Sequence, residues 1–177
     1  MSTDMNTIEQ LKDLENRAKA LDNPEKIDKN VDKYVGIVHE FGKSSFLECD
    51  CIGLCKLFYR THGWRQTFSD KKPITKDWQN KEGVMRLFRY FKKNFKQTPY
   101  ADDLDFGDVV LFKINGDFHF GIYVDAGKVL AMEVPVVYGK SQCTLYHRRL
   151  WIKGFCYGYK RDPNAILRSS LIKRAMR

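Results

Sequence analysis

The sequence predicts an α+β fold in which N-terminal helices pack on an antiparallel sheet of about five strands. Apolar residues recur every three or four positions in the first half of the chain, and this period changes to two after about residue 108. Helices that precede the strands, rather than alternate with them, are typical of this class. The length of 177 residues is enough for one domain with additional helices.

The helices follow from apolar stripes and from the residues that interrupt them. Asn23-Pro24 separates the first two, and Asp50 is the expected N-cap of the third. A loop over residues 42–45 and an irregular surface stretch over residues 68–80 complete this half. The expected helices span residues 5–21, 25–35, 50–63 and 82–96.

The strands follow from alternating apolar residues and from the turns between them. Asn115-Gly116 is a strong signal for a type I′ hairpin. The expected strands span residues 109–114, 118–124, 128–134, 143–146 and 155–160, and a basic helix is expected over residues 165–176. The chain thus divides into an N-terminal helical extension (1–24), a main domain (25–162) and a basic C-terminal helix (163–177).

Composition and charge exclude several protein classes. The 12 Phe, 9 Tyr and 3 Trp residues exclude a disordered chain, and the net charge of +9 favours anionic partners. The five cysteines are too few for a disulfide scaffold of this length. No stretch of about 18 apolar residues predicts a membrane span, and no signal peptide is visible, so we expect synthesis in a cytosol without export by that route.

Cys51 and His119 are candidates for nucleophilic catalysis. Cys51 falls in the first turn of its helix, where free backbone N–H groups and the helix dipole favour a thiolate and can bind an oxyanion. His119 lies on a strand whose neighbour on the same face, Gly121, leaves space for the start of that helix. The competing interpretations are a cysteine that only packs in the core and a hydrogen-bonded structural histidine.

Several segments resemble, in order and spacing, a known family of papain-like cell-wall cysteine peptidases, the NlpC type. Asp50-Cys51-Ile52-Gly53-Leu54 is similar to its nucleophile motif, and His119-Phe120-Gly121-Ile122-Tyr123 to its base motif. The supporting segments are 35–42, 106–112 and 151–160. The resemblance covers about residues 27–162, and the bacteriophage tail-associated branch is the most similar.

The resemblance implies a papain-like fold and a cysteine endopeptidase that cuts the stem peptides of peptidoglycan after a D-isoglutamyl residue. Cys51 would be the nucleophile and His119 the general base and acid. Asp50, His39 and Gly121 would lie at the substrate. We expect no cofactor and no metal. The expected location is the virion tail tip, with other tail or baseplate proteins as partners.

Three positions depart from the family pattern. Ala131 replaces the polar residue that usually orients the imidazole, and Glu133, two residues on, is the candidate substitute. His39 stands where a tyrosine is common, and Ile52 replaces a small hydroxyl residue. These departures keep a second hypothesis open, in which the chain is a structural tail hub or assembly protein with the peptidase fold and little or no activity.

Two further classes are less favoured. Cys49, Cys51 and Cys55 lie close together in sequence, but no second tight pair of ligands follows, as a structural zinc site would require. The helix at 82–96 mixes aromatic and basic residues, as some nucleic-acid-binding proteins do. An inward apolar stripe with solvated charges explains that helix better, so nucleic acid is not an expected partner.

Overall fold

The structure is a computed structural model that describes residues 28–62, 64, 68, 70–133 and 141–162. The helices predicted over residues 5–21 and 165–176 lie outside the described residues, as do the segments 1–24 and 163–177. Among the residues described, no helix is both long and apolar enough to cross a membrane.

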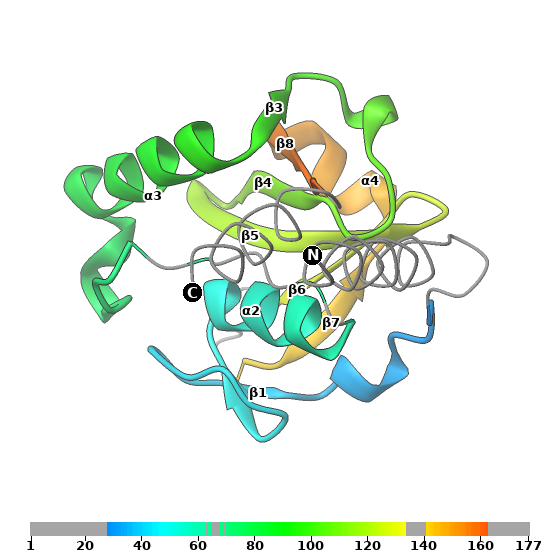
Figure 1. Cartoon of the computed structure of the whole chain (residues 1–177), viewed down its shortest axis with the longest axis horizontal. Helices are drawn as coiled ribbons and strands as arrows, with labels where there is room; N and C mark the ends of the chain where they lie inside the picture. Colours follow the sequence, from blue (N-terminus) through cyan, green and yellow to red (C-terminus); the bar gives the residue numbers. More distant parts are fainter. Residues whose placement is uncertain (1–27, 63, 65–67, 69, 134–140, 163–177) are drawn as a thin grey trace, which may run out of the picture.

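A six-stranded antiparallel sheet forms the centre of the fold (Figure 1), with the strand order β3-β8-β4-β5-β6-β7. Its strands are β3 (Lys96–Thr98), β4 (Val109–Ile114), β5 (Asp117–Asp125), β6 (Lys128–Met132), β7 (Cys143–Tyr146) and β8 (Phe155–Lys160). The α+β class is therefore confirmed. The sheet has one strand more than expected, because β3 is a short polar edge strand without an alternating apolar pattern.

The predicted type I′ hairpin joins β4 to β5. Asn115 and Gly116 have φ angles of 53° and 92°, and both angles are positive, as this turn requires. The six register pairs between β4 and β5 include Phe112 opposite His119. This hairpin fixes where His119 lies on the sheet.

The helix predicted over residues 25–35 is wrong for its described part. Residues 28–35 contain only the 3₁₀ turn η1 (Asp32–Tyr34). The backbone that follows leaves the helical path and bonds to β7, because Gly36 donates to the Cys143 carbonyl and Cys143 donates to the Ile37 carbonyl. A short parallel pair, β1 (Val38–His39) with β2 (Glu48–Cys49), then leads the chain to the third predicted helix.

Two long helices pack on one face of the sheet (Figure 1), α2 (Cys51–Thr61) and α3 (Lys81–Asn94). Their apolar stripes share one core with Leu111, Phe120 and Ile122 of the strands. A smaller core on the opposite face contains Phe112, Ala131 and Trp151. The remaining short elements are η2 (Lys76–Gln79), η3 (Ala101–Asp103), α4 (Arg148–Trp151) and η4 (Ile152–Gly154).

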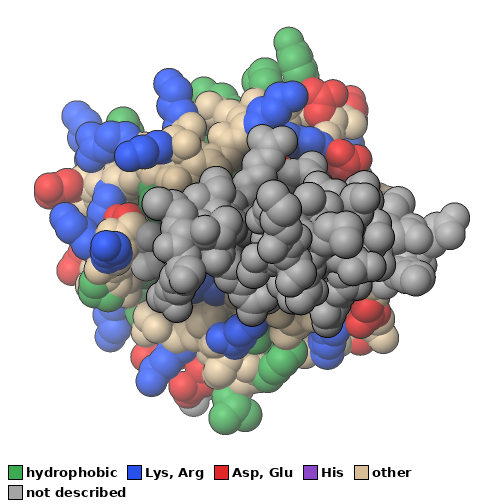
Figure 2. All heavy atoms as spheres, in the orientation of Figure 1, with side chains coloured by type: hydrophobic (Ala, Val, Ile, Leu, Met, Phe, Trp, Pro, Cys, Tyr) green, Lys and Arg blue, Asp and Glu red, His purple; other side chains and the backbone are tan. Residues whose placement is uncertain are grey.

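The basic residues of α3 point away from the core. Val84, Leu87 and Phe91 are buried, whereas Arg89 and Lys92 are exposed. Figure 2 shows Lys and Arg side chains gathered where α3 lies in Figure 1. The helix ends at Asn94 rather than at residue 96, because the chain becomes extended at Phe95 and enters β3. The inward apolar stripe predicted for this helix is confirmed.

Candidate active site

Asp50 fixes the start of α2. One carboxylate oxygen accepts the backbone N–H of Gly53 at 2.6 Å, and the other accepts the N–H of Gly42 at 2.6 Å. The side chain is buried, and burial raises its pKa although both hydrogen bonds lower it. Asp50 is therefore the predicted N-cap and ties the preceding loop to the helix. Its expected place at the substrate stays a prediction.

We expect Asp50→Ala to lower the free energy of unfolding by about 2 kcal/mol, because an N-cap and a second buried N–H lose their acceptor together. Urea denaturation followed by circular dichroism measures this change. Asp102→Ala, which removes an exposed carboxylate paired with Arg148, is the control and should change stability by less than about 1 kcal/mol. Equal losses in the two variants would contradict the positioning role of Asp50.

The Cys51 side chain is 5% exposed at the first turn of α2. Burial raises the pKa of its thiol, and the charge of Asp50 raises it further. The backbone amides of Phe120, Ile52 and Cys51 lie near the sulfur and lower the pKa, but they do not outweigh burial. The expectation that the helix start depresses this pKa overall is therefore wrong for the protein without substrate. The sulfur rests as a neutral thiol near three backbone amides.

The sulfur approaches β5 where that strand has an open edge. Pairing between β5 and β6 begins at Gly121 and Ala131, so among the described residues β4 is the only strand that pairs with residues 117–120. The amide of Phe120 in this open stretch is the one that contacts the Cys51 sulfur. Because Phe120 follows His119 directly, the structure brings the start of α2 to the backbone next to the candidate base.

His119 is 9% exposed, and its ring packs against Phe112 with centroids 5.8 Å apart. Burial lowers its pKa, Asp117 raises it and His39 lowers it. Its Nε2 atom is buried and has no hydrogen-bond partner among the described residues. His119 is thus a neutral imidazole with a nitrogen that is not committed to another group, and the alternative of a hydrogen-bonded structural histidine gains no support at that nitrogen.

Gly121 makes room for a neighbouring strand rather than for α2. A Cβ atom on Gly121 would lie 2.5 Å from the Val129 side chain and 2.9 Å from Cβ of Ala131. Phe112, Val129 and Ala131 belong to the core opposite α2, so His119 and Gly121 face away from the body of that helix. The expected packing of the helix start over Gly121 is therefore wrong, because side chains alternate along β5.

Among the described residues, neither Ala131 nor Glu133 forms a hydrogen bond with the imidazole of His119. Ala131 pairs with Gly121 and is fully buried. Glu133 forms backbone hydrogen bonds with Gln142 and Ser141, and among the described residues its carboxylate does not bond to His119. The carboxylate that acts on His119 is that of Asp117, which the sequence analysis missed. Its position two residues before His119, on the same face of the strand, was the available signal.

His39 lies near the candidate base. It occupies β1, its ring packs edge-on against Phe41 with centroids 4.6 Å apart, and its charge lowers the pKa of His119. Burial lowers the pKa of His39, while Asp50 and Glu40 raise it. Electrostatic effects thus link His39 to Asp50 and to His119, and Asp50 to Cys51, while the roles of these residues stay predictions.

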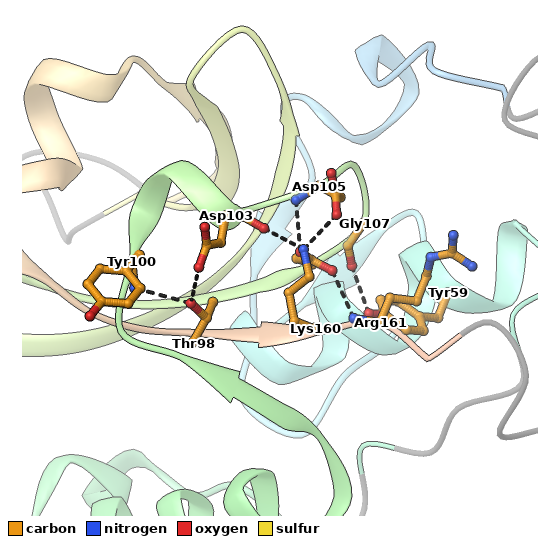
Figure 3. Close-up of polar contacts among 9 residues, drawn as sticks. Tyr59, Thr98, Tyr100, Asp103, Asp105, Gly107, Lys160 and Arg161 are labelled. Carbon is orange, nitrogen blue, oxygen red and sulfur yellow. Dashed lines mark hydrogen bonds and ion pairs between the residues drawn. The ribbon is translucent and has the colours of Figure 1, made fainter.

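A second buried carboxylate, Asp108, fixes the start of β4 (Figure 3). It accepts the N–H of Asp105 and the N–H of Arg161, both at 2.8 Å, and its Oδ2 lies 2.7 Å from the Lys160 ammonium. Lys160 also contacts Asp105 at 2.6 Å. Next to this network, the Tyr59 hydroxyl of α2 donates to the Gly107 carbonyl at 2.7 Å. The Gly-Asp segment thus joins β4, β8 and α2.

Buried sulfur atoms surround the nucleophile. Cys49 lies 3.7 Å from the Met132 sulfur, and burial raises the pKa of Cys49, Cys55 and Cys143. Within the described ranges, no three His, Cys, Asp or Glu side chains are placed to hold a metal ion. These cysteines act as small apolar core residues.

Comparison with known proteins identifies the family of the chain. The NlpC/P60 family matches residues 36–158, which include Cys51, His119 and all of the sheet except the last two residues of β8. No curated protein matches the chain. Members of this family are cysteine peptidases that hydrolyse peptidoglycan. Because the match covers more than half of the 177 residues, the chain belongs to the NlpC/P60 family.

Proposed function

We propose that this protein is a cysteine endopeptidase that cleaves the stem peptides of peptidoglycan, with Cys51 as nucleophile and His119 as general base and acid. Two observations carry the proposal. The Cys51 sulfur lies near backbone amides at the start of α2 and near the amide of Phe120, and the preceding residue, His119, has a buried ring nitrogen without a hydrogen-bond partner among the described residues. The backbone amide of β5 that lies near the sulfur belongs to Phe120, the residue directly after His119. Family membership supports the reaction class.

The resting protonation states determine how the thiol is activated. Both Cys51 and His119 are neutral, because burial raises the pKa of the thiol and lowers the pKa of the imidazole. The imidazole removes the thiol proton as the sulfur attacks the peptide carbonyl, and it then returns that proton to the leaving amine. The N–H groups at the start of α2 are placed to stabilise the oxyanion.

The pH dependence of kcat/KM should reflect these states. The neutral imidazole is the active form, so kcat/KM is expected to fall as the pH drops through a pKa below 6.5, the ordinary histidine value. On the alkaline side it should stay level to above pH 9, because the thiol remains protonated there. Initial rates between pH 4 and 10 test this profile. A preformed thiolate would instead give fast alkylation of Cys51 already near pH 6.

The direct test of the proposal is the release of peptides with new amino termini from purified sacculi. Wild-type protein should release them, and Cys51→Ala should release none above background. Cys156→Ser is the matched control, because Cys156 is a partly buried cysteine on β8, away from the start of α2. Equal release by wild type and Cys51→Ala would refute the hydrolase and leave the structural tail protein with a peptidase fold.

We also propose, more specifically, that the protein acts at a phage tail tip and cuts after a D-isoglutamyl residue. This proposal rests on the resemblance to the tail-associated branch and on the bulky Ile52 after the nucleophile. Tail and baseplate proteins would then be its partners. Stable copurification of the protein with tail particles supports this location, and its absence from purified virions would contradict it.

A further inference from the structure

The structure assigns a positioning role to Gln79, which we infer holds the backbone beside His119 in place of the missing sheet neighbour. This inference rests on the proposed function of His119. Gln79 lies at the end of η2, directly before Asn80, the N-cap of α3. Nothing in the sequence motifs of the family points to this residue.

The open edge of β5 needs partners for its backbone groups. In an antiparallel sheet, alternate residues direct N–H and C=O toward the same neighbouring strand. Phe118 and Phe120 therefore direct theirs to one edge, and the described part of β6 does not pair with them there because its pairing starts at Gly121. Partly buried backbone groups without partners are costly, so another element has to supply these bonds.

The side-chain amide of Gln79 supplies both bonds at Phe118. Its Nε2 donates to the Phe118 carbonyl at 2.6 Å, and its Oε1 accepts the Phe118 N–H at 3.0 Å. This pair of hydrogen bonds replaces the N–H donor and the C=O acceptor that a residue of a neighbouring strand would provide. At the next position along the same edge, the amide of Phe120 contacts the Cys51 sulfur. His119 therefore lies between Phe118, whose backbone Gln79 holds, and Phe120, whose amide lies near the nucleophile.

Packing keeps Gln79 in this position. Trp78, its neighbour in η2, is buried and packs against the Phe120 ring with centroids 6.1 Å apart. Phe88 of α3 packs edge-on against the Phe118 ring at 5.4 Å. Phe118 and Phe120, the neighbours of His119 in the chain, thus pack against η2 and α3, the two elements that Gln79 helps to connect. We therefore expect a displacement of Gln79 to move the backbone at His119.

The test replaces Gln79 with methionine, which keeps the chain length and removes both hydrogen bonds. Gln97→Met is the matched control, because the Gln97 side chain lies on β3 and makes no hydrogen bond among the described residues. Gln79→Glu is the intermediate variant. It keeps an acceptor for the Phe118 N–H, and as a carboxylate it lacks the donor for the Phe118 carbonyl.

Three measurements are expected to change in Gln79→Met and not in Gln97→Met. Hydrogen exchange of the Phe118 amide should become about tenfold faster, since two bonds are lost. The pKa of His119, followed by NMR of its ring, should rise toward 6.5, because burial is what lowers it. Asp117 and His39 are the charged groups that act on this ring, and both stay in place. The kcat for peptide release should fall about tenfold with KM unchanged, and Gln79→Glu should lie in between.

The outcomes separate this inference from the proposed function. If exchange at Phe118 rises while the His119 pKa and kcat stay at wild-type values, Gln79 is only structural and the inference is overturned. If wild-type protein releases no peptide but the His119 pKa still shifts in Gln79→Met, the hydrolase proposal fails and the positioning role stands. Should Gln79→Met not fold, the His119 titration in Gln79→Glu decides, and an unshifted pKa there overturns the inference.

Discussion

Replacing His119 with alanine is expected to lower kcat for peptide release from sacculi by about a thousandfold, because the reaction loses the group that takes and returns the thiol proton. The loss should be this large because the Cys51 thiol does not ionise unaided, given that burial raises its pKa. KM should change little, since a general base acts mainly in the transition state. Initial rates at pH 7.5 over a range of sacculus concentrations measure both parameters.

His147→Ala is the control for this experiment. His147 is exposed and lies before the short helix α4, so its removal should leave kcat within about twofold of wild type. Asp117→Asn is the informative third variant. Asp117 raises the pKa of His119, so its neutralisation should shift the acid limb of the pH profile to lower pH. Activity retained in His119→Ala and lost in His147→Ala would refute the assignment of the base.

The largest expected effect on stability comes from Gly53→Ala. A Cβ atom at this position would lie 1.8 Å from the backbone carbonyl oxygen of Lys43 and 3.2 Å from a carboxylate oxygen of Asp50. Backbone atoms cannot yield as a flexible side chain would, so the loop must move away from the helix. That movement also breaks the bond from the Ser44 hydroxyl to the Gly53 carbonyl at 2.9 Å. We expect a loss of about 4 kcal/mol or more, and protein that is largely unfolded.

Gly116→Ala provides the comparison. Gly116 has open space around it but a φ of 92°, so alanine there costs backbone strain of about 1 kcal/mol without a clash. Thermal unfolding and soluble yield of the two variants distinguish steric exclusion from strain. Equal melting temperatures for Gly53→Ala and Gly116→Ala would show that the loop adapts, and would contradict the close approach at the start of α2.

The sheet and the two packed helices could be predicted because each repeats a local pattern. The apolar stripe of α3 and the alternation along β4 and β5 are visible in the sequence, and Asn115-Gly116 specifies its turn. The segment before residue 36 could not be predicted in this way. Its stripe matches a helix, but the chain directly after it, at Gly36 and Ile37, bonds to the distant β7, and such a long-range contact leaves no local signal.

The candidate site was predictable in its residues and not in its arrangement. The positions of Cys51 and His119 follow from the motifs, and the structure places the sulfur at the residue after His119. We expected α2 to start over the face of β5 that carries His119, but α2 packs on the other face. Alternation along one strand does not say which of its two faces a helix covers. The roles of Asp117 and Gln79 depend on where β6 stops pairing, which no sequence pattern marks.

The protonated resting state of Cys51 has a consequence for how the protein is handled. Peroxide and other oxidants react with exposed thiolates, and the Cys51 sulfur is neither exposed nor ionised. Purified protein should therefore keep its peptidase activity in aerated buffer without added reductant. Damage should instead begin at Cys156, the cysteine with partial access to water.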